Sequence, residues 1–299
     1  MPAWTGVFPA VTTKMREDGS IDLVATGHSV ERLIENGVSA VIMLPMLGEN
    51  SSLTIEEKEQ VVRVGVEAAA GRVPVLSGLA ETSQDNAIAA AKRYKTYGAQ
   101  GLMVFPCLGY MTDPRETSAW LRGIGSATDL PIMIYNNPIS YKVDVTPEIL
   151  ETVRDVDTIQ YIKEETGDPR RVTDLYNALG DRFGIFCGID DLIVESIALG
   201  VTGWVSGMTN AWPKECVALF KLAQAGRYEE ARKIYRIMTP SFHLDTHVKL
   251  VQYIKLAEHL VAGSPQWVRA PRLPLVGAEL AFVEETIQSA IAALKTVTL

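Results

Sequence analysis

A regular alternation of short apolar runs with amphipathic segments most constrains what this chain can fold into. Over the first two thirds of the sequence, apolar runs of strand length are separated by amphipathic segments of about ten to sixteen residues, the pattern of a parallel sheet covered by helices. Eight strands are predicted, at Gly6–Thr12, Ala40–Leu44, Val73–Gly78, Gly101–Phe105, Pro131–Asn136, Thr158–Lys163, Gly184–Gly188 and Gly203–Ser206. Eight strands that are each followed by a helix fit an α/β fold of the (β/α)8 TIM barrel type better than an open doubly wound sheet.

The strand pattern stops after Gly226. Residues 227–299 have the pattern of helices, interrupted by loops that begin near Gly263 and Arg269. These helices have no further strand to cover, so an appendage on a complete barrel is favoured over an independent second domain. We therefore expect a barrel over residues 1–226 and a C-terminal helical extension over residues 227–299, packed on the barrel.

The charge balance limits the possible partners and the compartment. The chain has 28 Lys and Arg residues against 36 Asp and Glu residues, a formal net charge of −8. An acidic protein is a poor match for nucleic acid or an anionic membrane surface, since both favour basic patches. No apolar stretch reaches the roughly 18 residues that a membrane span needs, and Met1 to Thr12 lack the features of a secretory signal. We expect a cytoplasmic protein whose three cysteines are reduced, because they are widely spaced and odd in number.

Reactive groups in a barrel of this type stand at the C-terminal ends of the strands. Lys163 closes an otherwise apolar strand, and side-chain alternation places it on the face opposite that of Glu164. Desolvation in a barrel mouth favours the neutral form of a lysine, and a neutral amine can attack a carbonyl carbon. Position alone leaves a second interpretation open, a structural ion pair with Glu49, Glu164 or Glu165.

Two other strand ends carry groups that suit this chemistry. Tyr135 ends its strand in the same way, and a phenol beside an amine can move protons during imine formation. An aromatic ring that fills the top of the barrel is the alternative interpretation. The turn at Leu47 and Gly48 could offer backbone N–H groups to a carboxylate, and Glu49 is expected to orient neighbouring groups rather than to act as a base.

Together, these strand ends resemble those of the dihydrodipicolinate synthase / N-acetylneuraminate lyase family, the pyruvate-dependent class I aldolases and lyases. The similarity extends from Gly6 to about Ala225. The family motifs appear as Pro45-Met-Leu-Gly-Glu49 for G-x-x-G-E, Tyr135-Asn-Asn-Pro138 for Y-N-x-P, Lys163-Glu-Glu-Thr-Gly-Asp168 for K-E-x-x-G-D, Gly188-Ile-Asp-Asp191 for G-x-D-D, and Gly200-Val-Thr-Gly-Trp-Val-Ser206 for G-x-x-G-x-(I/V)-S, followed by Asn210 and Pro213.

The resemblance implies roles for these residues. Lys163 becomes the Schiff-base lysine, Tyr135 the proton shuttle, and the Leu47–Gly48 backbone the binding site for the carboxylate of a 2-oxo acid. It also implies a small-molecule 2-oxo acid as the substrate and a homotetramer built as a dimer of dimers. No G-x-G-x-x-G follows a predicted strand, and we expect neither a cofactor nor a metal.

Three departures separate this chain from the dihydrodipicolinate synthases within the family. Met46 and Leu47 replace two hydroxyl residues of the turn that join a relay with the shuttle tyrosine. The relay tyrosine that comes from a neighbouring subunit falls near Leu108, and is absent or replaced by Tyr110. The arginine that recognises the second substrate's carboxylate in lysine biosynthesis aligns with Ser140, whose neutral hydroxyl cannot form a bidentate pair. We therefore predict a family member that is not dihydrodipicolinate synthase itself.

The predicted activity is that of a class I, Schiff-base lyase. Lys163 condenses with the keto group of a 2-oxo acid, and the resulting iminium acts as an electron sink. The sink permits retro-aldol cleavage to pyruvate plus an aldehyde, or dehydration of a 2-keto-3-deoxy sugar acid or related hydroxylated 2-oxo acid. The predicted substrate contacts are Leu47, Gly48, Glu49, Tyr110, Asn137, Ser140, Gly188, Asp190, Ser206 and Thr209. Several could equally be structural, and Asp190 and Asp191 could cap the helix that follows.

Two alternatives belong to other classes. In a metal-dependent aldolase on the same barrel, His243 and His247 would place two ligands on one helix face, with Asp245 between them. No third ligand is at hand, so a surface or interface role is favoured for these histidines. The incomplete hydroxyl relay also suggests a non-catalytic barrel that binds a 2-oxo acid as a sensor.

Overall fold

A computed structural model describes residues 4–297 of the chain and contains one eight-stranded parallel sheet. The strands are β1 (Gly6–Pro9), β2 (Val41–Met43), β3 (Val75–Leu79), β4 (Gly101–Val104), β5 (Ile132–Asn136), β6 (Ile159–Glu164), β7 (Gly184–Cys187) and β8 (Gly203–Ser206). Their spatial order is β1-β8-β7-β6-β5-β4-β3-β2, and a single parallel bridge between Ala10 and Ile42 joins the two ends. The predicted (β/α)8 barrel is confirmed, and each predicted strand overlaps an observed one.

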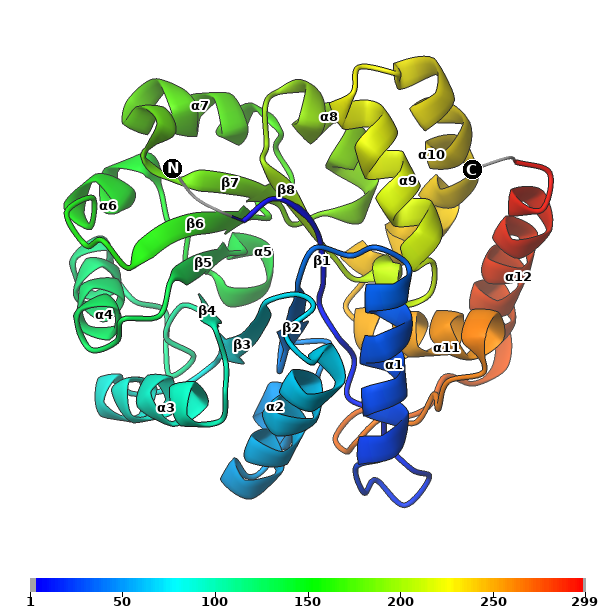
Figure 1. Ribbon diagram of the computed structural model, residues 1–299, viewed down its shortest axis with the longest axis horizontal. Coiled ribbons are helices and arrows are strands. Elements are labelled where there is room, and N and C mark those ends of the chain that lie inside the picture. The colour runs from blue at the N-terminus through cyan, green and yellow to red at the C-terminus, as the bar shows by residue number, and fades with distance from the viewer. Residues whose placement is uncertain (1–3, 298–299) are drawn as a thin grey trace.

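Helices surround the strands in the order that the sequence pattern predicts (Figure 1). The helices within the barrel region are α1 (Leu23–Glu35), α2 (Ile55–Ala69), α3 (Gln84–Thr96), α4 (Pro114–Ser126), α5 (Pro138–Tyr141), α6 (Pro147–Thr152), α7 (Arg170–Leu179), α8 (Ile193–Ala198) and α9 (Pro213–Gln224). Single 3-10 turns are η1 (Asn50–Ser52), η2 (Gly180–Arg182), η3 (Asp190–Leu192) and η4 (Met208–Asn210). Among the helices of residues 4–297, none is both long and apolar enough to cross a bilayer.

The first strand is shorter than predicted, and a side chain explains the difference. β1 ends at Pro9, although the prediction extends it to Thr12. Beyond Pro9, the Asn210 side chain takes the place of a neighbouring strand, because its amide donates to the Ala10 carbonyl at 2.7 Å. Its carbonyl oxygen accepts from the Thr12 N–H at 3.4 Å. Asn210 follows β8, which pairs with β1 in the sheet but lies about 200 positions away in the sequence, so the local apolar pattern cannot reveal this contact.

Aromatic rings fill the barrel interior at the end remote from the strand C-termini. Trp4 stacks on Tyr161 with ring centroids 4.4 Å apart, and Phe8 contacts Phe186 at 4.8 Å. The backbone N–H of Trp4 also donates to the Tyr161 hydroxyl at 2.8 Å. These contacts make one end of the barrel a packed core, so the C-terminal ends of the strands remain as the place for a site.

The last part of the described chain is helical and lies at one side of the barrel (Figure 1). It contains α10 (Tyr228–Phe242), η5 (His243–Thr246), α11 (Leu250–Ala262) and α12 (Gly277–Leu294). α10 packs on α9 and α12, and α11 packs on α12. The proposed boundary between barrel and extension falls in the connection between α9 and α10. Residues 1–3 and 298–299, the outer ends of the two predicted regions, lie outside the described residues.

Two fully buried ion pairs attach α11 to the barrel. Lys255 binds Glu49, which follows β2, with 2.5 Å between Nζ and Oε1. Glu258 binds Lys14, which follows β1, at 2.6 Å. All four side chains have no exposed surface. Because a buried charge without a partner is costly, these pairs fix where α11 sits over the strand ends.

Removal of one buried charge is therefore expected to destabilise the protein strongly. In Lys255→Met, the partners of the Glu49 carboxylate that remain among residues 4–297 are the Arg269 N–H at 2.9 Å and the Arg272 guanidinium at 3.6 Å. We expect a loss of about 3 kcal/mol in the free energy of unfolding, because one buried carboxylate loses its nearest cation. The measurement is the midpoint and slope of denaturant unfolding, followed by circular dichroism.

A surface pair provides the matched control. Arg63 and Glu59 form an exposed i,i+4 pair at 2.8 Å on α2. Arg63→Ala is expected to change the free energy of unfolding by less than about 1 kcal/mol. Equal losses in the two variants would contradict the anchoring role of Lys255.

Candidate active site

Lys163 lies at the C-terminal end of β6, inside the mouth of the barrel. In the sheet register it is opposite Tyr135 of β5 on one side and Phe186 of β7 on the other. Only 6% of its surface is exposed. Its Nζ lies 3.9 Å from the centroid of the Tyr135 ring and 2.6 Å from a carboxylate oxygen of Glu165. The ion pair that position alone left open is thus present with Glu165, and the amine also faces the aromatic ring of Tyr135.

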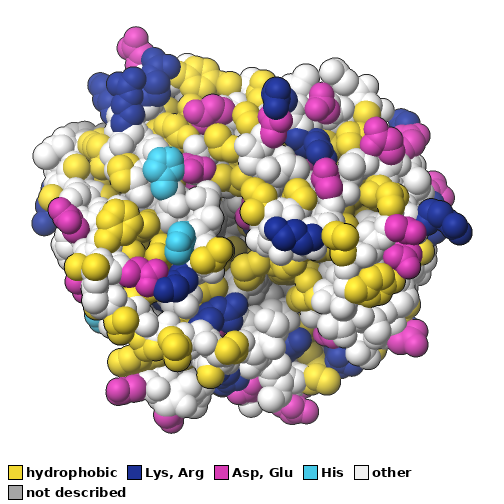
Figure 2. All heavy atoms as spheres, turned by 180° about the vertical axis from the view of Figure 1, so that it is seen from behind, with side chains coloured by type: hydrophobic (Ala, Val, Ile, Leu, Met, Phe, Trp, Pro, Cys, Tyr) yellow, Lys and Arg dark blue, Asp and Glu magenta, His cyan; other side chains and the backbone are white. Residues whose placement is uncertain are grey.

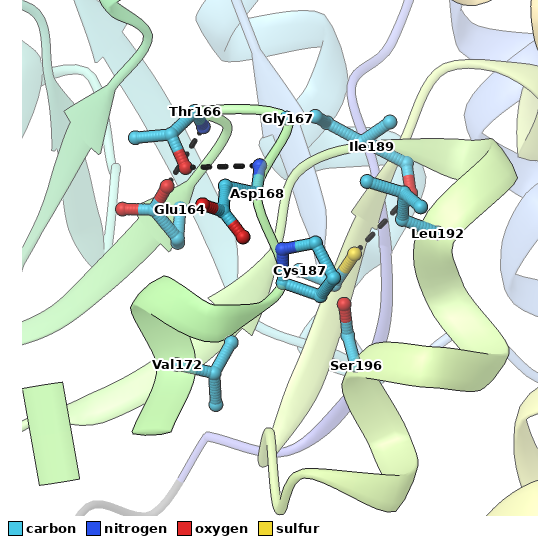
Figure 3. A pocket seen from close by; sticks show the side chains of 10 residues that line it. Glu164, Thr166, Gly167, Asp168, Val172, Cys187, Ile189, Leu192 and Ser196 are labelled. Carbon is cyan, nitrogen blue, oxygen red and sulfur yellow. Dashed lines mark hydrogen bonds between the residues drawn. The ribbon is translucent and has the colours of Figure 1, made fainter. Parts of the chain in front are cut away.

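Glu164 points to the other side of β6, as side-chain alternation predicts. It lines a separate cavity between β6, α7 and α8, together with Thr166, Asp168 and Cys187 (Figure 3). Its carboxylate accepts from the Thr166 N–H at 2.7 Å and from the Asn136 amide at 3.0 Å. These contacts shape the turn that carries Glu165, and therefore hold the site from outside the barrel.

Tyr135 and Asn137 bring two strand ends together. The Asn137 amide nitrogen donates to the Tyr135 hydroxyl at 3.1 Å and to Glu165 Oε1 at 2.8 Å. Asn137 Oδ1 meanwhile accepts from the Ser140 N–H at 2.8 Å and so starts α5. Burial and the nearby Glu165 carboxylate raise the pKa of the Tyr135 phenol well above its ordinary value. Tyr135 is therefore a protonated donor at neutral pH rather than a ready base.

A cavity of about 370 Å³, including the space open to solvent, lies in front of Lys163. Figure 2 shows a hollow near the middle of the face that Figure 1 hides, with apolar side chains gathered around it. The residues that line the cavity are Ala10, Pro45, Met46, Leu47, Met103, Tyr135, Lys163, Glu165, Gly188, Gly207, Asp245 and Leu250. The lining is therefore mainly apolar, with one cation, two carboxyl groups and one phenol.

Gly188 lines the cavity because a side chain does not fit there. A Cβ at this position would lie 2.9 Å from Lys163 Cε and 3.0 Å from both the Glu164 carbonyl oxygen and Glu165 Cβ. The missing side chain thus leaves the room in which the Lys163 stem lies. Of the predicted substrate contacts, Gly188 and Leu47 lie on this cavity.

The turn after β2 places its residues in different surroundings. Leu47 lines the cavity, and within residues 4–297 no acceptor lies in hydrogen-bond range of its N–H. The Gly48 N–H donates to the Pro45 carbonyl at 3.1 Å. Glu49 points away from the cavity, with a left-handed φ of 56° and its carboxylate on Lys255. The structure therefore does not bring Glu49 to Lys163.

A cluster of buried polar side chains lies at the ends of β7 and β8, next to the site. Asp190 accepts from the Trp204 indole N–H at 3.0 Å and from the Met208 N–H at 2.7 Å. The Thr209 hydroxyl donates to the Ser206 hydroxyl at 2.7 Å. Burial raises the pKa of Asp190 to about 6, although the hydrogen bonds that it accepts oppose this shift. The cluster joins the ends of β7 and β8. Asp190, Ser206 and Thr209 were predicted as substrate contacts, but they do not line the cavity.

The expected capping by Asp190 and Asp191 is wrong. Neither side chain caps η3 or α8. Asp190 is drawn to the Trp204 and Met208 donors instead, and Asp191 lies 2.6 Å from Nδ1 of His243. Contacts between distant segments thus outcompete the local capping pattern.

Tyr110 and Ser140 lie on the surface of the single chain. Tyr110 is 60% exposed, and its hydroxyl donates to Glu116 at 3.0 Å. Ser140 is exposed in α5. Neither residue lines the Lys163 cavity of its own chain.

His243 and His247 do not share a helix face, which the metal-dependent alternative required. His243 begins the 3-10 turn η5, and His247 follows it with an extended backbone. Their side chains have separate partners, Asp191 for His243 and the stacked Tyr253 ring for His247. Across residues 4–297, His, Cys, Asp and Glu side chains form no group of three or more that could hold a metal ion.

Sequence reasoning missed two acidic residues of the cavity. From the sequence, Glu165 is only one of three possible ion-pair partners for Lys163. Its position two residues after Lys163 places it on the same face of the strand, which is the signal that could have found it. Asp245 comes from η5, far beyond the barrel strands, so the strand-end rule could not find it. Burial and the neighbouring Asp190 and Glu165 carboxylates raise the pKa of Asp245 well above its ordinary range.

The fold and this site define the class of protein: a (β/α)8 barrel with a buried lysine at the C-terminal ends of its strands. The sequence model of the dihydrodipicolinate synthetase family matches residues 3–290. The chain belongs to this family, and is a lyase of the dihydrodipicolinate synthase type.

Individual relatives are moderately similar over nearly their whole length. The 4-hydroxy-tetrahydrodipicolinate synthase of Exiguobacterium sibiricum is 31% identical over 272 residues, which cover 91% of this chain and 92% of that protein. The enzyme of the same name from Methylacidiphilum fumariolicum has a solved structure with a TM-score of 0.92 at 26% identity, covering 98% of this chain and 97% of that one. A prophage protein of the same family from Escherichia coli, solved with pyruvate, has a TM-score of 0.90 at 26% identity over 97% of this chain and 99% of that one.

The buried Asp190 carboxyl is expected to make stability depend on pH. Its pKa lies at about 6 in the folded protein against 3.8 ordinarily, so between these values the folded state holds a proton that the unfolded chain releases. Stability therefore falls as the pH rises through this window. Asp190→Asn is expected to flatten this part of the profile and, since an amide oxygen replaces only one carboxylate acceptor, to cost about 1–3 kcal/mol.

The measurement is the thermal unfolding midpoint at a series of pH values from 4 to 7. Asp168→Asn is the control, because Asp168 lies at the surface and pairs with Arg170 at 2.6 Å. The Asp245 carboxyl contributes to the profile in all three proteins. An unchanged slope in Asp190→Asn would show that Asp190 does not titrate in this window.

Proposed function

We propose that this protein is a class I lyase in which Lys163 forms a Schiff base with a 2-oxo acid. The single observation that carries the proposal is the placement of the Lys163 amine, buried at the end of β6, lining a cavity and 3.9 Å from the Tyr135 ring centroid. A buried amine that lines a cavity suits imine chemistry, because burial favours the neutral form, which can attack a carbonyl carbon.

The reaction requires that the carboxylate of the substrate be held while its keto carbon faces Lys163. The Leu47 N–H supports this role, because it belongs to a cavity residue and has no acceptor within residues 4–297. Substrate binding would place the carboxylate at the turn after β2, across the mouth from β6. The iminium then draws electrons from the C3–C4 bond in a retro-aldol cleavage, or from the C3–H bond in a dehydration.

Within this chemistry, we propose a hydroxylated 2-oxo acid, such as a 2-keto-3-deoxy sugar acid, as the substrate. Met46 and Leu47 give the cavity wall an apolar character where the dihydrodipicolinate synthase pattern has hydroxyl residues. Ser140 provides no cation for a second carboxylate. Both features support an activity other than 4-hydroxy-tetrahydrodipicolinate synthesis. The homotetramer is part of the same proposal, and sedimentation equilibrium tests it.

The imine proposal predicts a covalent adduct on one lysine. When the protein is incubated with pyruvate and reduced with borohydride, the mass of the intact chain should rise by that of one reduced pyruvate imine. Peptide mass spectrometry should place the adduct on Lys163, and Lys163→Ala should give none while remaining folded. Lys95→Ala serves as the control variant, because Lys95 is an exposed lysine on α3 that pairs with Asp129 at 2.6 Å and does not line the cavity. An adduct on any other lysine, or no adduct, would overturn the proposal.

The substrate proposal makes a separate prediction. We expect no formation of 4-hydroxy-tetrahydrodipicolinate above background when the purified protein is given the substrates of that synthase. A panel of 2-keto-3-deoxy sugar acids should give pyruvate or a dehydrated 2-oxo acid, and chelator treatment should not reduce the rate. Synthase activity comparable to that of a relative measured side by side would contradict this assignment, whereas an adduct without turnover of any keto-deoxy acid would favour a sensor.

A further inference from the structure

We propose that Glu165 is a catalytic residue that carries protons to and from Lys163 Nζ during imine formation. This inference rests on the proposed function and names the group that moves its protons. The observation behind it is a contact chain that links three strand-end groups: Lys163 to Glu165 at 2.6 Å, Glu165 to Asn137 at 2.8 Å, and Asn137 to the Tyr135 hydroxyl at 3.1 Å.

The two oxygens of the Glu165 carboxylate have different tasks. Oε1 accepts a hydrogen bond from the Asn137 amide, which fixes the orientation of the carboxylate. Oε2 accepts no hydrogen bond of normal geometry in the described part of the chain, and its close neighbour is the Lys163 ammonium. An oriented carboxylate whose second oxygen lies 2.6 Å from the reacting nitrogen has the geometry of a general base.

Other side chains around the amine are less suited to this task. The turn residues Met46 and Leu47 line the same cavity and have no exchangeable side-chain proton. Tyr135 contacts the amine with its ring, while its hydroxyl is bound to Asn137. Asp245 is the other carboxyl group of the cavity, but in the described residues Lys163 forms its ion pair with Glu165, so Glu165 is the group in contact with the amine that can both accept and donate a proton.

The proton transfers balance over one cycle of imine formation. The Glu165 carboxylate takes one proton from the Lys163 ammonium, and the neutral amine attacks the keto carbon to form the C–N bond. The protonated Glu165 gives that proton to the carbonyl oxygen, which becomes the carbinolamine hydroxyl. Glu165 then removes a second proton from the nitrogen and delivers it to the hydroxyl, which leaves as water as the C=N bond forms. The products are a protonated iminium, one water and the original carboxylate.

The direct test is the rate at which the unaltered enzyme and Glu165→Gln form the reducible pyruvate adduct. Glutamine keeps the size of the side chain and an oxygen for Asn137, but it cannot carry a proton. We expect the adduct to form on Lys163 in both proteins, and its rate constant, from timed borohydride quenching, to fall about a hundredfold in Glu165→Gln.

Glu59→Gln is the control, because Glu59 is an exposed carboxylate on α2 that pairs with Arg63 at 2.8 Å and does not line the Lys163 cavity. Its rate constant is expected to stay within a factor of three, in a protein whose circular dichroism spectrum is unchanged. The pH profile provides a second readout. The titratable groups around Glu165 are Lys163, Tyr135, Tyr141, Cys187 and Asp245, so a limb of the profile that disappears only in Glu165→Gln belongs to Glu165.

Chemical rescue separates proton transfer from a merely structural ion pair. Glu165→Ala opens space beside Lys163, and added formate should restore imine formation at least tenfold, while chloride at the same ionic strength should not. A rate in Glu165→Gln within threefold of the unaltered enzyme, or a slow Glu165→Ala that formate does not accelerate, would overturn the role of Glu165. Absence of an adduct in the unaltered enzyme would instead overturn the Schiff-base function, and the inference with it.

Discussion

The buried contact between helix α11 and the first two strand ends is the constraint on which the site depends. Lys255 with Glu49 and Lys14 with Glu258 place two ion pairs without exposed surface between the barrel and its helical extension. The attraction within a buried ion pair offsets the desolvation free energy of its two charges only when both partners are positioned accurately. The two pairs therefore allow one placement of α11. That placement brings Asp245 and Leu250, just before and at the start of α11, to the wall of the Lys163 cavity.

The positive charge of Lys163 inside the cavity is paired with the negative charge of Glu165. One ammonium group faces one carboxylate at 2.6 Å, and the Asp245 carboxyl has its pKa raised by burial and by two neighbouring acids. The proposed substrate, an anionic 2-oxo acid, would meet Glu165 as well as Lys163 in this site. Transfer of a proton from Lys163 to Glu165 would remove both charges at once, which lowers the electrostatic cost of bringing an anion to the neutral amine. The acidic surplus of the whole chain thus coexists with a site whose charges compensate locally.

The sequence predicted the barrel, the strand ends and the positions of Lys163, Tyr135 and Leu47 at the cavity. The spacing of apolar residues locates the strands, and sites in such barrels lie at the C-terminal ends of the strands. It failed where a side chain from a distant segment competes with a local pattern. Asn210 ends β1 early, and the Trp204 and Met208 donors hold Asp190 away from a helix cap. Each of these contacts joins the ends of two different strands, which sheet pairing brings together and no local pattern encodes.

By itself, the sequence determined which strand ends carry reactive groups, because the alternation of side chains along a strand is a local property of the backbone. Only the tertiary structure decided which of those groups meet. It placed Glu165 rather than Glu49 or Glu164 against Lys163, linked Glu165 to Tyr135 through Asn137, and added Asp245 from outside the strands. Distances of a few ångströms between parallel strands follow from register and from the packing of the helical extension, and both arise only once the barrel has closed.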